Sequence, residues 1–255
     1  MSAEDKQTQQ TSLDKAIDIL SLLGQEDNKT IRELSDELNL AKSTTHRVLQ
    51  ILERRGLVKK NRYSEKYKLG YKILEFSSRM KNQDEIRELA IEYMKELSTI
   101  TGDTVQLATL TPEQRVIIIE TVEGTNDLRV FARPGQTYPL TYGNFGKVFL
   151  SSMTLDEIKK QLKEHPLKAY GSGSILDEER FITEVDTVRQ NQLAISSDDP
   201  IDGALTIAVP IVNSYNEMIA AISIAGVKTH YKMSHIEELK EAIKDFAEKI
   251  MSEIK

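Results

Sequence analysis

A change in hydrophobic period within the first 70 residues constrains the fold of this chain most strongly. Between Ser12 and Arg55 apolar residues recur at steps of three and four, and polar breaks at 24–29 and near Asn39 divide the stretch into three predicted helices. From Gly56 to Leu69 the period falls to two, which predicts two short strands joined by a turn. Three helices followed by a hairpin are the outline of a winged helix-turn-helix.

Positive charge is concentrated in the same stretch of the chain. Residues 40–72 contain ten Lys and Arg against two Glu, a net charge of +8, whereas the whole chain carries −6. A local basic field on an acidic chain indicates a module that binds a polyanion. The alternative is a solvated basic face without a partner, which the charge alone does not exclude.

The side chains of the third predicted helix favour nucleic acid as that polyanion. Its buried stripe, which includes Thr45 and Leu49, must pack on the first two helices and leaves polar and basic side chains outward. Ser, Thr and Gln bind base edges in a major groove, Arg binds guanine, and a helix N-terminus with Lys attracts phosphate. Cations on the hairpin would meet the flanking backbone or minor groove. The predicted DNA-binding residues are Lys42, Ser43, Thr44, His46, Arg47 and Gln50 on the helix and Lys59, Lys60, Arg62 and Lys66 on the hairpin.

After a helical segment at 70–80 and a polar hinge at 81–84, the chain is predicted to mix helices and strands. Thr154 and Ser234 each have a Glu three residues later, a pattern typical of a helix start. The segments 206–212 and 218–225 are rich in β-branched residues or Ala and predict central strands. The predicted helices are 86–100, 146–152, 154–162, 177–190 and 234–254, and the predicted strands are 105–110, 115–122, 128–131, 193–196, 206–212 and 218–225.

Composition excludes several classes of chemistry. The chain has no Cys, which removes disulfides, thiolate metal sites and Cys nucleophiles, and its four His are scattered. Its longest nearly apolar run, 218–227, is roughly half the length of a membrane helix. The polar segment 1–12 lacks the apolar stretch of a secretion signal. We therefore expect a cytoplasmic protein without a membrane partner.

Motifs for catalysis or cofactor binding fail on their spacing. The glycines of Gly143-x-x-Gly146-Lys147 are too close together for a phosphate loop, and Val148 stands where Ser or Thr is required. His230 and His235 are five residues apart, which does not suit a pair of metal ligands on one helix face. Adjacent acids at Asp198-Asp199, before a Pro, are typical of a turn. We expect no enzyme activity, no cofactor and no metal site.

The order and spacing of several motifs closely resemble those of the IclR family of bacterial transcriptional regulators. The resemblance runs from about residue 12 to residue 230. The motifs are Ser12-Leu13-x-x-Ala16-x-x-Ile19-Leu20, Ile31-x-x-Leu34-x-x-x-Leu38, Lys42-Ser43-Thr44-x-His46-Arg47-x-Leu49, Tyr67-x-Leu69-Gly70, Thr101-Gly102-Asp103-Thr104-Val105-x-Leu107-Ala108, Pro139-Leu140 with Gly146-Lys147, and Ala220-Ala221-Ile222-Ser223-Ile224-x-Gly226.

This resemblance implies an α+β fold with a division into four parts. Residues 1–11 would be a disordered tail, 12–70 a winged helix-turn-helix domain, 71–84 a linker helix and hinge, and 85–255 a GAF-like α/β effector-binding domain with an antiparallel sheet. It also implies a regulator that binds double-stranded operator DNA as a homodimer or a dimer of dimers. A small-molecule effector would modulate that binding.

The family's effector pocket carries over position by position. Thr206 and Ser223 would donate hydrogen bonds to a carboxylate, with the Asn144 amide as a further donor, so the expected effector is a small organic acid. The alternative is that Thr206 and Ser223 satisfy their hydrogen bonds inside a sheet. The effector-binding residues implied by the resemblance are Val130, Asn144, Phe145, Ser196, Ala204, Thr206, Ser223 and Ala225.

Two other functions fit the composition. An enzyme or sensor of small molecules would use the basic N-terminal helices to dock a partner, and a protein–protein adaptor would use the winged fold without DNA. The outward polar set at 42–50 argues against the adaptor, which would expose apolar residues there. Turnover of candidate metabolites would distinguish an enzyme from a regulator that binds its ligand without chemistry.

Overall fold

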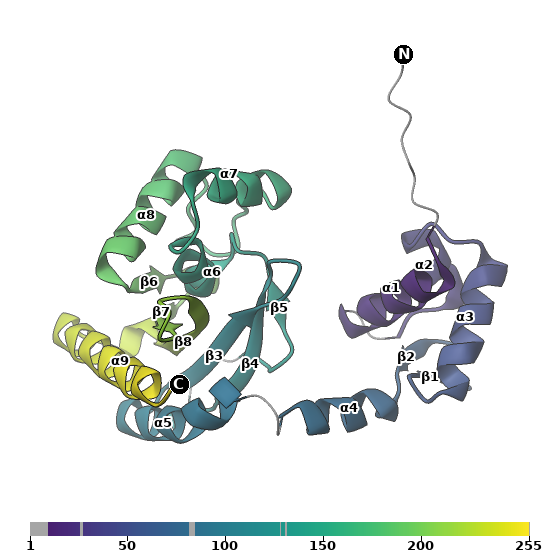
Figure 1. Cartoon of the computed structure of the whole chain (residues 1–255), viewed down its shortest axis with the longest axis horizontal. Coiled ribbons are helices and arrows are strands. Elements are labelled where there is room, and N and C mark those ends of the chain that lie inside the picture. Colours follow the sequence, from purple (N-terminus) through teal and green to yellow (C-terminus); the bar gives the residue numbers. More distant parts are fainter. Residues whose placement is uncertain (1–9, 26–27, 82–84, 128, 131, 255) are drawn as a thin grey trace, which may run out of the picture. The chain divides into compact units, whose positions relative to one another are not determined.

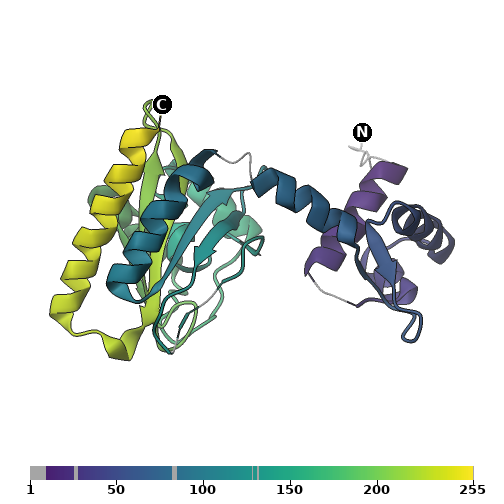
Figure 2. The same cartoon turned by 90° about the horizontal axis from the view of Figure 1, so that it is seen from below.

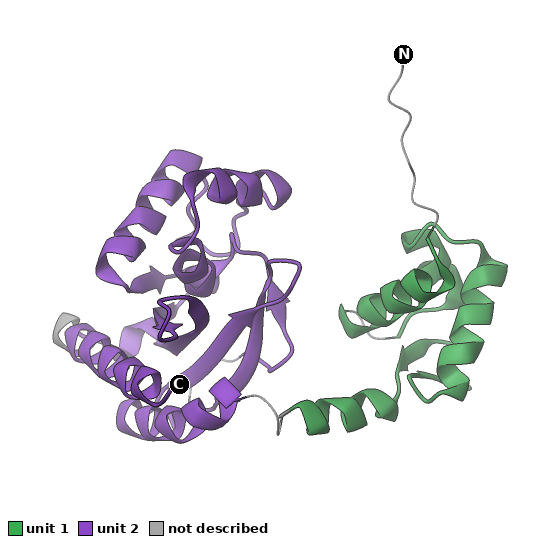
Figure 3. Ribbon diagram, in the orientation of Figure 1, with its two compact units in different colours: residues 1–83 green, residues 84–255 purple. Residues whose placement is uncertain are grey.

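The chain folds into two compact units, residues 1–83 and 84–255, each described here by itself (Figure 1; Figure 3). The computed structural model describes residues 10–25, 28–81, 85–127, 129–130 and 132–254. Most of the predicted tail at 1–11, the hinge residues 82–84 and both ends of the predicted strand 128–131 lie outside the described residues.

The first unit contains the three predicted helices and the predicted hairpin, so this part of the prediction is confirmed. Thr30 caps the second helix through a capping box with Glu33, as its spacing indicates. The core of the unit is formed by eight buried apolar residues from the helices and the hairpin. Its elements are α1 (Ser12–Gln25), α2 (Ile31–Glu37), α3 (Lys42–Arg54), β1 (Val58–Lys60), β2 (Tyr67–Leu69) and α4 (Tyr71–Lys81).

The second unit is built on a six-stranded antiparallel sheet in the order β5-β4-β3-β8-β7-β6. Helices α5 and α9 lie side by side on one face of the sheet (Figure 2), and α6, α7 and α8 cover the other face (Figure 1). The elements are α5 (Glu85–Thr101), β3 (Thr104–Leu110), β4 (Val116–Val122), β5 (Thr137–Tyr138), α6 (Gly143–Leu150), α7 (Leu155–Glu164), α8 (Glu178–Asn191), β6 (Ala194–Ser197), β7 (Ala204–Val212), β8 (Met218–Val227), the short 3₁₀ helix η1 (Lys228–His230) and α9 (Met233–Glu253).

The two faces of this sheet carry side chains of different size. The face toward α5 and α9 presents large aliphatic residues such as Leu107, Ile207 and Ile222, which fill the space beneath those helices. Residues directly opposite each other in an antiparallel pair share a face, and on the α6 side the register places small or polar residues in line. These are Gln106, Ala108, Ala194, Ser196, Thr206, Ala208, Ala221, Ser223 and Ala225.

Several elements begin or end at residues other than the predicted ones, and three differences change a predicted feature. Residues 129 and 130 form no strand; the chain instead rejoins β4 at Thr137, after a turn in which Gly135 donates its N–H to the Ile118 carbonyl at 2.7 Å. Helix α6 begins at Gly143, whose φ of +64° turns the chain into the helix three residues before the predicted start. Helix α9 begins at Met233 with Lys232 as its N-cap, so Ser234 lies inside the helix rather than capping it.

Candidate functional site

Helix α3 separates its side chains into a buried face and an exposed face. Val48, Leu49 and Leu52 are buried in the core of the first unit. Thr45 is fully buried, and its hydroxyl accepts a hydrogen bond from Ser35 at 3.1 Å, so the polar atom is satisfied where α2 meets α3. This packing holds α3 against α2 and points the remaining side chains of the helix outward.

The predicted DNA-binding side chains of α3 lie on its solvent side. Lys42, Ser43, His46, Arg47 and Gln50 are exposed, and Thr44 is half-buried. The N-cap residue Ala41 makes no side-chain capping bond, so the first N–H groups of the helix remain available to an anion. The exposed face therefore combines base-reading groups with an anion-attracting helix end.

The hairpin carries the four predicted DNA-binding cations, which differ in their exposure to solvent. Lys59 and Arg62 are exposed, and Lys66 is half-buried. Lys60 forms an ion pair with Glu65, which raises the pKa of the Lys60 ammonium and keeps it charged. That pair already engages Lys60 within the hairpin.

Tyr63 is a residue of the hairpin tip that sequence reasoning did not select. The Asn61 side-chain oxygen accepts hydrogen bonds from the backbone N–H groups of Tyr63 and Ser64, which builds the turn. The Tyr63 side chain is fully exposed, at 100% of its accessible area. The sequence did contain a signal for Tyr63, an aromatic residue at the turn between two basic strands.

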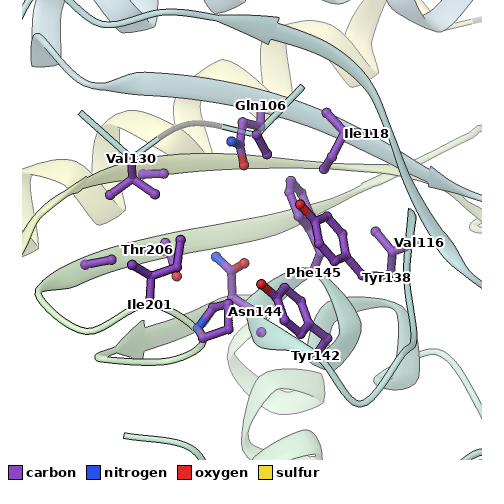
Figure 4. A pocket seen from close by; sticks show the side chains of 15 residues that line it. Gln106, Val116, Ile118, Val130, Tyr138, Tyr142, Asn144, Phe145, Ile201 and Thr206 are labelled. Atoms are coloured by element: carbon purple, nitrogen blue, oxygen red, sulfur yellow. The ribbon is translucent and has the colours of Figure 1, made fainter. Parts of the chain in front are cut away.

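A cavity lies between the small-residue face of the sheet and the start of α6 (Figure 4). The short side chains of this face leave about 570 Å³ of empty space beside the start of α6, including the part open to solvent. The lining residues are Gln106, Val116, Ile118, Val130, Ala132, Tyr138, Tyr142, Gly143, Asn144, Phe145, Pro200, Ile201, Ala204, Thr206 and Ala225.

Six of the eight predicted effector residues line this cavity, and two do not. Ser223 is buried behind the lining, where its hydroxyl accepts from the Asn144 amide at 3.1 Å. Ser196 is also buried and accepts from the Lys147 ammonium at 3.1 Å. Both hydroxyls are therefore satisfied within the protein. The six residues in the lining are Val130, Asn144, Phe145, Ala204, Thr206 and Ala225.

The tyrosines of the lining were missed because they reach the cavity through a long-range strand pairing. Tyr138 and Tyr142 are stacked, with ring centroids 4.5 Å apart and planes 2° apart, and Tyr170 meets Tyr142 edge to face at 4.6 Å. Burial, followed by the neighbouring tyrosines and Asp199, raises the pKa of Tyr142 to about 12, and burial raises the pKa of Tyr138. Both phenols stay protonated at neutral pH and can donate hydrogen bonds.

The N-terminus of α6 opens on the cavity, with Gly143, Asn144 and Phe145 in the lining. The N-cap residue Tyr142 makes no side-chain capping bond. Among the described residues, no acceptor receives the N–H groups of these three residues. Free N–H groups at the positive end of a helix bind a carboxylate or another anion.

A buried ion pair ties α6 to the loop that precedes β7. The Lys147 ammonium lies 3.4 Å from an Asp199 carboxylate oxygen, and both residues are more than 90% buried. The other Asp199 oxygen accepts from the Ser174 hydroxyl at 2.8 Å. Because Pro200 and Ile201 follow Asp199 directly and line the cavity, this pair fixes two walls of the cavity to each other.

No group of three His, Cys, Asp or Glu side chains in the described ranges is arranged to hold a metal ion. No described helix is both long and apolar enough to cross a membrane.

Two family models match the chain. The IclR helix-turn-helix domain matches residues 12–62, and the model described as bacterial transcriptional regulator IclR C-terminal matches residues 79–252. The HTH-type transcriptional regulator KdgR of Escherichia coli is 31% identical over 96% of this chain and 92% of its own length. The HTH-type transcriptional regulator KipR of Bacillus subtilis is 30% identical over 94% of this chain and 95% of its own length.

Solved structures show the same fold. An IclR transcriptional regulator from Alicyclobacillus acidocaldarius is 27% identical with a TM-score of 0.84, covering 95% of this chain and 98% of that one. An IclR homologue from Microbacterium hydrocarbonoxydans, crystallised with 4-hydroxybenzoate, is 21% identical with a TM-score of 0.76, covering 95% of this chain and 98% of that one. The predicted fold class and the resemblance to the IclR family are confirmed.

Replacing Lys147 by Met should destabilise the second unit by about 3–5 kcal/mol, because the Asp199 carboxylate would stay buried without its counter-charge. Urea unfolding of the full chain measures the loss, and hydrogen exchange of peptides from α6 assigns it to the second unit. The double variant Lys147→Met/Asp199→Asn should lose less than the single variant.

Lys240→Met is the matched control. Lys240 pairs with Glu237 on the surface of α9, and such a pair contributes at most about 1 kcal/mol. An equal loss in Lys147→Met and Lys240→Met would contradict the structural role of the buried pair.

Proposed function

The chain belongs to the IclR family of bacterial transcriptional regulators, and from this premise we propose specific roles for its DNA-binding residues. Ser43, Thr44, Arg47 and Gln50 read base edges in the major groove, while Lys42 and the helix N-terminus bind phosphate. His46 lies on the same exposed face and contributes a further polar contact. The observation that carries this proposal is the exposed polar face of α3 opposite its buried apolar stripe.

The hairpin residues serve affinity rather than sequence choice in this proposal. Lys59, Arg62 and Lys66 neutralise phosphates beside the major groove, and Lys60 does so in competition with its partner Glu65. Tyr63, at the exposed tip, adds contact with the backbone or the minor groove.

The cavity at α6 is the proposed effector site, and a small organic acid is the proposed class of effector. The free N–H groups of Gly143, Asn144 and Phe145 would hold the carboxylate. The Thr206 hydroxyl, whose hydrogen bond to the Ser196 carbonyl is long at 3.5 Å, would turn from it and donate to the ligand. The Ala204, Ala225 and Val130 side chains would contact the carbon skeleton. By linkage, an effector that changes operator affinity must bind the free and the DNA-bound protein with different affinities.

We propose that the regulator works in the cytoplasm as a homodimer, with two dimers able to associate. Exposed apolar side chains on α4 support self-association, because exposed apolar patches mark interaction surfaces. Tyr71 is 78% exposed, Leu74 is 66% exposed and Met80 is 64% exposed. Two-fold symmetry of a dimer predicts a pseudo-palindromic operator.

Leu74→Glu should shift the protein toward monomers, because a charge on an apolar contact surface would be desolvated on association. Sedimentation velocity over a range of concentrations measures the change. Leu155→Glu, at a site 49% exposed on α7 in the second unit, is the control and should keep the parent's state. Equal behaviour of the two variants would count against the α4 surface.

The affinity for DNA should fall steeply with salt, because cations on α3 and the hairpin release counterions from the duplex. For about six to ten neutralised phosphates, the slope of log affinity against log salt is about −5 to −9. Fluorescence anisotropy with a labelled DNA duplex at several salt concentrations measures this slope. A slope near zero would refute the phosphate contacts.

Arg47→Ala and Arg62→Ala should have different effects on specificity. Loss of Arg47 should remove about 1–3 kcal/mol of preference for operator over unrelated DNA, because a base contact disappears. Loss of Arg62 should weaken binding to both DNAs alike and make the salt slope less steep by about one. Competition binding with selected and scrambled duplexes measures both effects.

Arg180→Ala, which removes an exposed Arg from α8 in the second unit, is the control and should leave both DNAs bound as by the parent. Equal loss of specific and nonspecific binding in the Arg47 and Arg62 variants would contradict this division of roles.

A further inference from the structure

One polar side chain of the effector cavity, Gln106 on β3, forms no hydrogen bond with any residue that the structure describes. The residue is only 7% exposed, and its amide faces the cavity. A ligand that fills the cavity displaces water from this amide, so the ligand must supply the hydrogen bonds that the amide would otherwise lose.

We infer that the effector carries, besides its carboxylate, an uncharged hydroxyl or carbonyl group that hydrogen-bonds Gln106. This inference rests on the proposed effector site and specifies the second polar group of its ligand. It makes Gln106 the residue that determines specificity within the class of small acids.

The position of Gln106 suits a contact at the end of the ligand remote from α6. Gln106 on β3 pairs with Ser223 on β8, and both lie on the face of the sheet that α6 covers. Figure 4 shows the Gln106 and Asn144 amides entering the cavity from opposite walls, one from the sheet and one from the helix. A ligand held at the α6 N-terminus can meet Gln106 where it reaches the sheet wall.

Asn144 contributes to the helix end of the site. Its amide nitrogen donates to Ser223, which fixes the side-chain orientation and leaves its carbonyl oxygen without a described partner. An acceptor beside the helix end favours a ligand with a hydroxyl near its carboxylate.

The charges of the cavity limit the ligand to one carboxylate. Every described lining residue is uncharged at neutral pH, including the two tyrosines with raised pKa. Lys147, behind the lining, is already paired with Asp199. A second carboxylate would therefore be buried against Gln106 and apolar side chains without a counter-charge.

Much of the remaining lining is apolar. Val116, Ile118 and Val130 are among these residues, and they suit a short hydrocarbon segment that joins the carboxylate to the second polar group. A hydrocarbon end at Gln106 would leave the amide unpaired. The fitting ligand is therefore a monoanionic acid with a neutral polar group at its far end.

Matched acids test this inference on the full chain. The probes are ω-hydroxy acids of increasing length, from hydroxybutyrate to hydroxyoctanoate, each beside the unsubstituted acid and the dicarboxylate of equal length, with affinities measured by isothermal titration calorimetry at constant ionic strength. At the best length, the hydroxy acid should bind about tenfold or more tightly than both counterparts, because only it satisfies the amide without burying a second charge.

Gln106→Leu should abolish the preference of the hydroxy acid over the unsubstituted acid while the unsubstituted acid still binds. Gln190→Leu makes the same chemical change at an exposed position on α8 and should keep the preference. Thermal unfolding of both variants without ligand, at a temperature no lower than that of the parent, separates specificity from folding.

The possible outcomes test the effector site and the role of Gln106 separately. If acids bind but hydroxy acids gain nothing, or the Gln106→Leu variant keeps the parent's ranking, the inference about Gln106 is wrong while the effector site stands. If dicarboxylates bind most tightly, the limit to one carboxylate is wrong. If no acid of any length binds, the acid class itself is wrong, and the Gln106 inference is wrong with it.

Discussion

The size difference between the two faces of the central sheet is the constraint on which the second unit depends. Large aliphatic side chains on one face pack closely against α5 and α9, and the burial of their apolar surface stabilises the sheet. On the opposite face, strands β6, β7 and β8 carry Ala, Ser and Thr side chains. The cavity at the start of α6 lies where these short side chains leave room.

The first unit uses the same division on a smaller scale. Helix α3 is held by an apolar stripe and by one buried hydroxyl pair, Ser35 with Thr45, which needs the two helices in a single register. Its exposed side chains Lys42, Ser43, His46, Arg47 and Gln50 form no hydrogen bond or ion pair with the residues that the structure describes. In both units, therefore, the residues that fold the protein and the residues that meet a ligand or DNA alternate along the same elements.

This alternation explains which features the sequence predicts. The three helices, the hairpin and the main strands follow from local periodicity, and the exposed face of α3 follows from its buried stripe. Strand β5, the early start of α6 and the tyrosine wall depend on where the loop after β4 rejoins the sheet, which periodicity does not describe. Gln106 was also missed, and its signal was readable: one amide within a strand of apolar and Thr residues. Ser196 and Ser223 resemble pocket residues in sequence, yet hydrogen bonds within the protein already engage both hydroxyls.

Gly146 lies where α6 approaches the chain at Leu140. A methyl group on Gly146 would come within 2.0 Å of the Leu140 carbonyl oxygen, so any other residue there must push the helix away. The adjoining turn of α6 forms one wall of the cavity. The absence of a side chain at Gly146 therefore determines how closely this wall approaches the chain at Leu140. A larger residue at position 146 would therefore change the shape of the cavity without replacing any lining side chain.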